Sequence, residues 1–139
     1  MEGRIAVIAR KRALEKVASS LGAGYDFWAV SDFERAAREL RQNEFDLVLV
    51  ECYDEGSLDN CRRIAELCRV PVMAMVHGKE VNWQEMFDLG VAGYLPENAS
   101  AFEKGARIKA VMRRQEISRA AAVESPRNRL KVSSDESAA

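Results

Sequence analysis

The sequence predicts an α/β fold in which a parallel sheet is covered by helices on both faces. Short apolar segments alternate with amphipathic ones along most of the 139 residues, which is typical of successive strand–helix units. Several apolar segments are continuous, as expected for strands that are buried on both faces. Serine followed three residues later by glutamate marks the start of two amphipathic segments as helical.

The first half of the chain is predicted to contain three strands separated by two helices. Continuous apolar runs predict strands over 5–9 and 47–50, and an aromatic-containing segment predicts another over 25–30. Apolar residues at helical spacing predict one helix over 14–21 and a second over 32–42. This order is the beginning of a parallel sheet with crossover helices.

The second half continues the alternation. A third helix is followed by a predicted strand over 70–76, which is strongly apolar. A short helix over 81–89, a strand over 91–95 and a basic helix over 101–122 complete the pattern. The chain therefore contains five predicted strands and five predicted helices.

Four residues are predicted to set the ends of helices. Ser31 and Ser100 are each followed by glutamate three residues later, which predicts N-caps in capping boxes. Ser57 is predicted to cap the third helix. Gly90 is expected in the left-handed conformation just after the short fourth helix.

Right-handed crossovers leave few ways to arrange these elements, and they favour a flavodoxin-like (βα)5 doubly wound parallel sheet with strand order 2-1-3-4-5. In such sheets ligands bind at the carboxyl ends of the strands. Here those ends are predicted at residues 9–11, 51–52, 76–77 and 95–97.

The composition predicts one soluble domain over residues 1–122, with 123–139 as a polar linker or disordered tail. No apolar run reaches the roughly 18 residues that span a bilayer. The three cysteines have no zinc-type spacing, and the sequence has no signal-peptide pattern. We therefore predict a cytoplasmic protein without membrane contact, metal or cofactor.

Residues 3–115 resemble the receiver domains of bacterial response regulators. Residues 45–51 resemble the third strand of that family, which normally ends in the phospho-accepting Asp. Residues 71–76 resemble the fourth strand, which normally ends in Thr or Ser, and 87–97 resemble the fifth-strand region. The resemblance implies a signalling domain that is switched by phosphorylation of an aspartate.

The positions that carry this chemistry in the family are all changed here. By the resemblance, the acidic pair that holds Mg²⁺ aligns with Ala9 and Arg10, and the acceptor aligns with Glu51. The hydroxyl position aligns with Val76 and the lysine position with Glu97. Mg²⁺ requires oxygen ligands, which Ala9 and Arg10 cannot supply from their side chains. We therefore predict a degenerate pseudo-receiver that is not an enzyme and has no catalytic residues.

The substitutions also reverse the charge of the former site. We expect Arg10, with or without Lys11, to pair with Glu51 and Glu97 across the strand ends. An alternative is that these are unrelated surface charges worth less than about 1 kcal/mol each. His77 is interpreted as a loop histidine that faces solvent and has no role.

The resemblance implies that the domain acts through the face formed by the fourth helix, the fifth strand and the fifth helix. Tyr94 matches the switch aromatic of the family. The candidate interface residues on this face are Trp83, Met86, Phe87, Tyr94, Ile108 and Met112. The predicted partner is a second copy or another protein in transcriptional, two-component or phosphorelay signalling, with an output domain beyond the C-terminus as a further option.

Two alternatives belong to other functional classes. The first is a flavodoxin-like domain that binds a small phosphate-bearing ligand at Arg10 and Lys11, beside a helix N-terminus. The second is direct nucleic-acid binding by the basic last helix, because residues 103–131 contain nine basic and three acidic side chains. We rank nucleic-acid binding lowest because interleaved aromatic residues and a helix-turn-helix pattern are absent from the sequence.

Overall fold

The computed structural model describes residues 3–21, 24–77, 84, 88–124, 134–135 and 137–138. Its main sheet contains five parallel strands in the order β2-β1-β3-β4-β5, so the predicted flavodoxin-like order is confirmed. The strands are β1 (Gly3–Ile8), β2 (Tyr25–Val30), β3 (Leu47–Cys52), β4 (Val72–Val76) and β5 (Gly93–Pro96). Two short strands near the C-terminus, β6 (Ser134–Asp135) and β7 (Ser137–Ala138), pair with each other.

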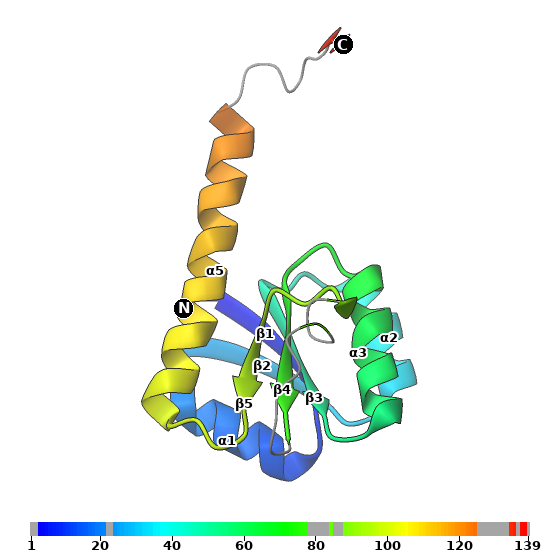
Figure 1. Ribbon diagram of the computed structural model, residues 1–139, viewed down its shortest axis with the longest axis vertical. Coiled ribbons are helices and arrows are strands. Elements are labelled where there is room, and N and C mark those ends of the chain that lie inside the picture. Colours follow the sequence, from blue (N-terminus) through cyan, green and yellow to red (C-terminus); the bar gives the residue numbers. More distant parts are fainter. Residues whose placement is uncertain are drawn as a thin grey trace.

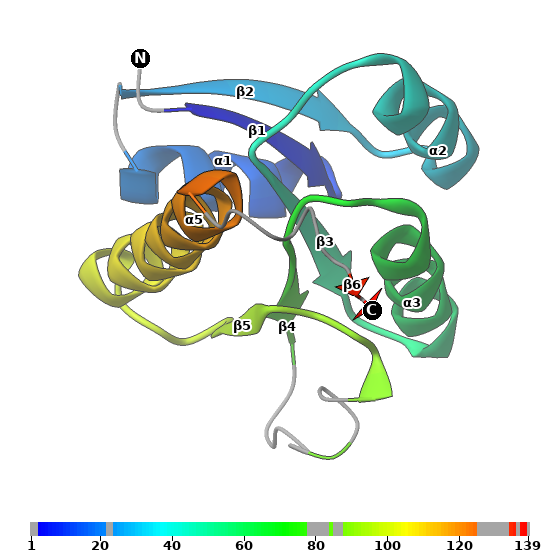
Figure 2. The same ribbon diagram turned by 90° about the horizontal axis from the view of Figure 1, so that it is seen from above.

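The described helices lie in two layers, one on each face of the sheet. They are α1 (Lys11–Leu21), α2 (Phe33–Gln42), α3 (Glu55–Leu67) and α5 (Ala101–Glu124). Figure 2 shows α1 and α5 on one face and α2 and α3 on the other. Because the five strands are parallel, their carboxyl ends meet at one edge of the sheet. We call this the carboxyl edge, and it lies at the bottom of Figure 1.

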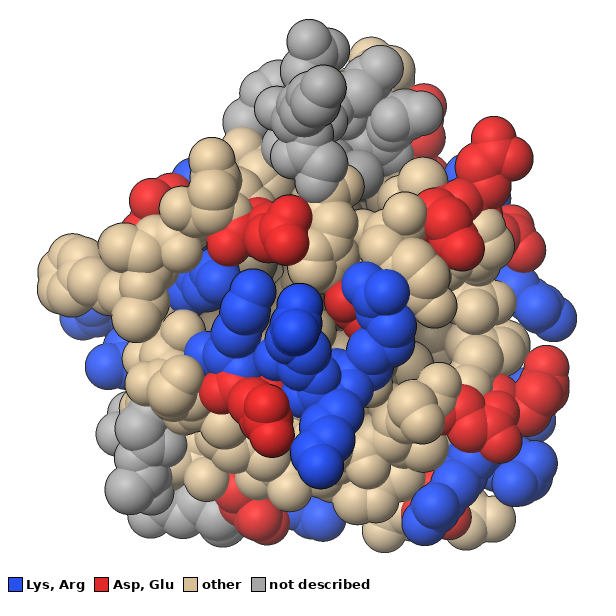
Figure 3. Space-filling view, turned by 90° about the horizontal axis from the view of Figure 1, so that it is seen from below, with Lys and Arg blue, Asp and Glu red and all other residues tan. Residues whose placement is uncertain are grey.

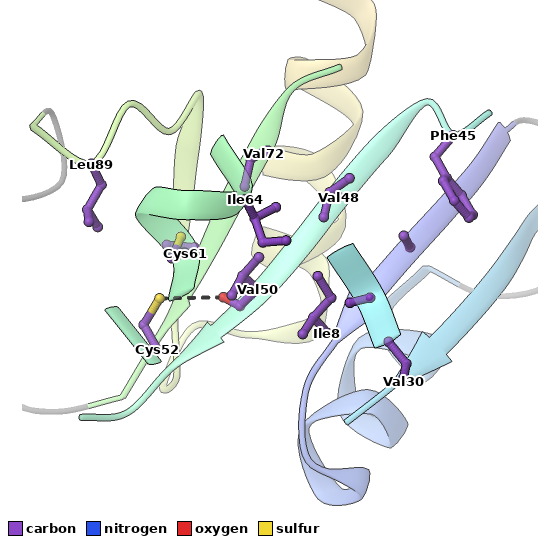
Figure 4. Close-up of a cluster of buried hydrophobic side chains, with 13 residues drawn as sticks. Ile8, Val30, Phe45, Val48, Val50, Cys52, Cys61, Ile64, Val72 and Leu89 are labelled. Carbon is purple, nitrogen blue, oxygen red and sulfur yellow. Dashed lines mark hydrogen bonds between the residues drawn. The ribbon is translucent and has the colours of Figure 1, made fainter. Parts of the chain in front are cut away.

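The core consists of two apolar clusters separated by the sheet. Every residue of β3 is buried, because this strand is central and has a helix layer on each side. Figure 4 shows the cluster on the α2–α3 side, in which Val50, Cys61 and Ile64 fill the space between β3 and α3. Cys52 and Cys61 are buried free thiols in this cluster. No described helix is both long and apolar enough to cross a membrane.

Helix α5 is used mainly to cover the sheet. Ile108 and Met112 were predicted as interface candidates, but Ile108 is 0% exposed and Met112 packs against the same cluster. Met112 is so close to β1 that a methyl group at Gly3 would lie 2.7 Å from its Cε. Ile108 is therefore a core residue and not part of a contact surface. Burial of an isoleucine side chain contributes about 1.5–3 kcal/mol to the stability of the fold.

Beyond this covered part, α5 continues past the sheet (Figure 1). Ile117 lies on this extension and is 62% exposed. The helix runs to Glu124, slightly beyond the predicted end.

Two of the three predicted N-caps are different residues in the structure. Asp32, and not Ser31, caps α2, since its carboxylate accepts the backbone N–H of Glu34. Asp54 caps α3, and Ser57 stands at the third helical position, where the two residues form a capping box. In each case a second cap-forming residue lies within three positions of the predicted one, and the point where the backbone turns helical decides between them. Ser100 accepts the N–H of Glu103, as predicted for α5.

Most of the predicted helix over 81–89 lies outside the described residues. This range includes the interface candidates Trp83, Met86 and Phe87, so the structure does not place them. Gly90 is described and has a φ of 78°. That left-handed conformation matches the expectation for the residue after a helix, and it favours glycine.

Candidate functional site at the carboxyl edge

Four polar side chains meet at the carboxyl edge, each just after or at the end of a strand. Arg10 follows β1, Glu51 lies in β3, His77 follows β4 and Glu97 follows β5. The backbone continues to pair at these points: His77 N donates to Cys52 O at 3.1 Å, and Glu97 N donates to Val76 O at 2.9 Å. The parallel pairing of the strands thus fixes the backbone positions of these residues.

Glu51 is the centre of the group and is only 3% exposed. Its Oε1 accepts the backbone N–H of Arg10 at 2.8 Å and the Nε–H of the same residue at 3.1 Å. Its Oε2 accepts from Arg10 Nη2 at 2.7 Å. The planar guanidinium fork matches the two oxygens of a carboxylate, so a buried negative charge is held by one residue through backbone and side chain together.

The side chain of Arg10 is itself held on a second side. Its Cζ lies 3.8 Å from the centre of the Tyr53 ring, a distance at which a guanidinium is attracted to an aromatic face. The guanidinium remains half exposed. Tyr53 was not singled out in the sequence, and no local pattern marks it, because its partner Arg10 follows the neighbouring strand β1, which is distant in the sequence.

His77 connects the two carboxylates. Its Nε2 lies 2.7 Å from Glu51 Oε2 and its Nδ1 lies 3.1 Å from Glu97 Oε2. The contact with Glu51 is close but is not a hydrogen bond. The side chain is 23% exposed. The interpretation of His77 as a solvent-facing loop residue is therefore wrong, because its ring lies against two carboxylates.

The expected pairing of Arg10 with Glu97 is also absent. Among the described residues, Arg10 forms its ion pair with Glu51, while Glu97 pairs with His77. Lys11 forms no ion pair with any acidic side chain in the described part of the chain. The physical reason is the strand order, since β4 separates β3 from β5 and places His77 between the two glutamates.

The network keeps both carboxylates charged. Burial raises the pKa of Glu51, but the hydrogen bonds from the Arg10 side chain and backbone outweigh it and lower the pKa below the ordinary value. The hydrogen bond and charge of His77 lower the pKa of Glu97, with smaller effects from Lys16 and Lys104. The bond to Glu51 raises the pKa of Arg10. The lowered pKa of each carboxyl means that its contacts stabilise the charged form.

The arrangement leaves little chemistry open to Glu51. Both of its oxygens already accept N–H groups from Arg10, and one also touches His77. The nearby hollows are small, with volumes of about 50 Å³ beside Arg10 and Glu51 and about 30 Å³ beside His77 and Glu97. These volumes suit a few water molecules. Within the described ranges, no three His, Cys, Asp or Glu side chains are grouped to hold a metal.

Tyr94, the predicted switch aromatic, is half-buried on β5 and packs against the α2–α3 cluster. The guanidinium of Arg107 lies 5.0 Å from its ring centre, and Arg107 Nη1 donates to the Tyr94 carbonyl at 3.4 Å. Arg107 also pairs with Glu103 at 2.8 Å. Tyr94 is therefore linked to the first turns of α5.

No protein-family model matches the chain, and no curated protein matches it either. Solved structures do match. NtrX from Brucella abortus is 15% identical with a TM-score of 0.78, and the match covers 92% of this chain but only 30% of NtrX. The signal receiver domain of a modulated diguanylate cyclase from Desulfovibrio desulfuricans G20 is 21% identical, covers 84% of this chain and 98% of that domain, and has a TM-score of 0.66.

A response regulator from Thermotoga maritima gives a similar result, with 20% identity, 78% of this chain and 96% of that chain covered, and a TM-score of 0.66. The chain has the fold of a receiver domain. At these identities the likeness concerns the fold alone, and the receiver-like domain described here spans less than a third of NtrX. Its activity must be argued from its own residues.

Proposed function

We propose that this receiver-like domain is a signalling module that does not use aspartyl phosphorylation and acts in the cytoplasm through protein contacts. It would belong to a two-component or transcriptional regulatory pathway, as the fold suggests. The single observation that carries the proposal is the occupation of the Glu51 carboxylate by Arg10.

A site for aspartyl phosphorylation needs a free acceptor oxygen and a bound cation. The acceptor oxygen has to be free to attack a phosphoryl group, and a divalent cation has to neutralise the charge that develops. Here a cation is already present in the form of the Arg10 guanidinium, bound to both oxygens of Glu51. A metal ion placed beside it would meet like charge, and Ala9 supplies no side-chain oxygen as a ligand.

The same geometry explains how the domain can keep a defined conformation without a phosphate. Glu51 joins β1 to β4 through Arg10 and His77, and His77 extends the link to Glu97 beyond β5. The Arg10–Glu51 ion pair and the two contacts of His77 thus tie together the strand ends that a bound phosphoryl group and its ligands would otherwise connect. The β5–α5 face, where Tyr94 and Arg107 lie, is one surface available for contacts with a partner or a second copy.

An NMR titration of the full chain with Mg²⁺ and then beryllofluoride, a mimic of an aspartyl phosphate, tests the proposal. The amides of Arg10, Glu51 and Glu97 should not shift more than those of Asp46 and Arg69 at the opposite edge, which serve as internal controls. Saturable shifts centred on the first three residues would mean that the site binds phosphoryl mimics, and the proposal would be wrong.

A further inference from the structure

The carboxyl edge carries a cluster of cations that the ion-pair network does not use. Figure 3 views this edge and shows Lys and Arg side chains gathered at its centre, with acidic groups beside and among them. We define the basic surface as Lys11, Arg12 and Lys16 of α1 together with Lys104 of α5. The first three are exposed and Lys104 is half-buried.

None of these four side chains forms an ion pair in the described part of the chain. Glu97 lies near Lys16 and Lys104, and the three residues line the same small hollow, but the carboxylate of Glu97 is paired with His77. Arg10 is excluded from the basic surface because Glu51 and Tyr53 hold it.

The first turn of α1 adds to the positive potential. Lys11 and Arg12 begin this helix, and its first turn contains no acidic residue. The N-terminal end of a helix carries a partial positive charge, so negative side chains are favoured there and cations are not. Two cations at this position cost some helix stability. A negatively charged partner would remove that cost on binding, which is a physical reason for the surface to attract one.

The details favour an acidic polypeptide over nucleic acid. The basic surface is compact, and Glu97 lines the same hollow as Lys16 and Lys104, so its carboxylate would repel a continuous phosphate backbone laid across them. Stacking of bases requires open aromatic faces, whereas the guanidinium of Arg10 covers the nearby ring of Tyr53. Separate carboxylates on a flexible segment can meet the four cations individually and avoid Glu97.

We propose that the basic surface docks an acidic segment of a partner protein, with Asp or Glu side chains contacting Lys11, Arg12, Lys16 and Lys104. This inference names the class of partner for the interaction module proposed above and rests on that function. Charge complementarity of this kind mainly raises the association rate and fixes the choice of partner.

The test is fluorescence anisotropy of a labelled oligoglutamate peptide with the full chain, at low and at raised salt. A triple variant, Lys11→Glu, Arg12→Glu and Lys16→Glu, removes most of the basic surface. The acids that it places at the start of α1 suit the helix dipole, so we expect the variant to fold, which circular dichroism can check. The matched control reverses three exposed arginines of α2 on the other face: Arg35→Glu, Arg38→Glu and Arg41→Glu.

We expect saturable binding that is weakened by salt, and a dissociation constant at least about tenfold higher for the α1 variant than for the α2 control. Equal weakening by both variants would show a general charge effect and overturn the proposal. Absence of binding would overturn it as well. Tighter binding of a duplex DNA of equal charge, lost in the α1 variant, would assign the surface to nucleic acid instead. None of these failures affects the beryllofluoride result, so the two proposals can fail separately.

Discussion

The two edges of the sheet use the same chemistry with different consequences. At the carboxyl edge Arg10 pairs with Glu51, whose side chain is 2% exposed. At the opposite, amino edge Arg4 lies 3.5 Å from Asp26, and the two side chains are 41% and 57% exposed. An exposed pair is screened by water and contributes little, whereas a buried carboxylate depends on its partners. Burial, and not the presence of an ion pair, therefore distinguishes the site from the rest of the surface.

The amino edge also has the larger hollow, about 640 Å³ in volume, lined by residues that include Arg4, Phe45 and Asp46. Its polar groups serve the fold, since Asp46 accepts the backbone N–H of Arg4 at 2.8 Å and Arg4 donates to the Glu44 carbonyl. The small hollow beside the buried carboxylate of Glu51 is thus a better candidate for a functional site than the larger hollow at the amino edge.

The largest effect is expected from Glu51→Ala. It removes a buried carboxylate, leaves a cavity and deprives Arg10 and His77 of their shared partner. Hydrogen bonds to charged groups contribute about 1.5–3 kcal/mol, so the free energy of unfolding should fall by about 2–3 kcal/mol in urea denaturation. Asp26→Ala breaks the exposed pair at the amino edge and serves as the comparison. If Glu51→Ala lowers the free energy of unfolding by less than Asp26→Ala does, the two edges do not differ in this way.

The dependence of stability on pH should separate the edges next. The pKa of Glu51 and that of Glu97 are both lowered in the fold, by Arg10 and by His77 respectively. Their stabilisation is complete above the pKa of glutamate in the unfolded chain and is lost as the pH falls through the folded values. Acid unfolding followed by circular dichroism should therefore be less steep for Glu51→Gln than for the unaltered chain. Identical acid profiles would contradict this origin.

A smaller effect is expected from His77→Ala. The variant loses one close contact with each glutamate but leaves Arg10 bound to Glu51, so the cost should be about 1 kcal/mol. The pKa of the Glu97 carboxyl should rise toward its ordinary value, which ¹³C NMR can follow. If the carboxyl of Glu97 titrates unchanged, His77 does not hold it.

The smallest effect is expected at the amino edge. Asp26→Ala breaks the exposed pair with Arg4, and pairs of this kind contribute from nothing to about 1 kcal/mol. The denaturation midpoint should stay close to that of the unaltered chain, and added salt should leave the difference small. A loss as large as that of Glu51→Ala would remove the contrast between the edges.

Local patterns in the sequence predicted the strands and helices, but they did not identify every capping residue or show which apolar faces are covered. The apolar periodicity located all five strands of the main sheet to within a few residues. The same periodicity made Ile108 and Met112 look available for contacts, because an apolar face of a helix gives no sign of what covers it. The N-caps of α2 and α3 are Asp32 and Asp54, and not Ser31 and Ser57, since each helix start offers two residues able to cap it.

The sequence by itself determined the fold and the identity of the side chains at the strand ends, because the alternation of apolar segments and the residue types are properties of the chain. The tertiary structure decided which charges pair. Arg10, Glu51, His77 and Glu97 are far apart in the sequence, and the strand order alone puts His77 between the two glutamates and turns Arg10 to Glu51. It also decided which carboxylate is buried, since burial depends on the helices and neighbouring strands that surround β3.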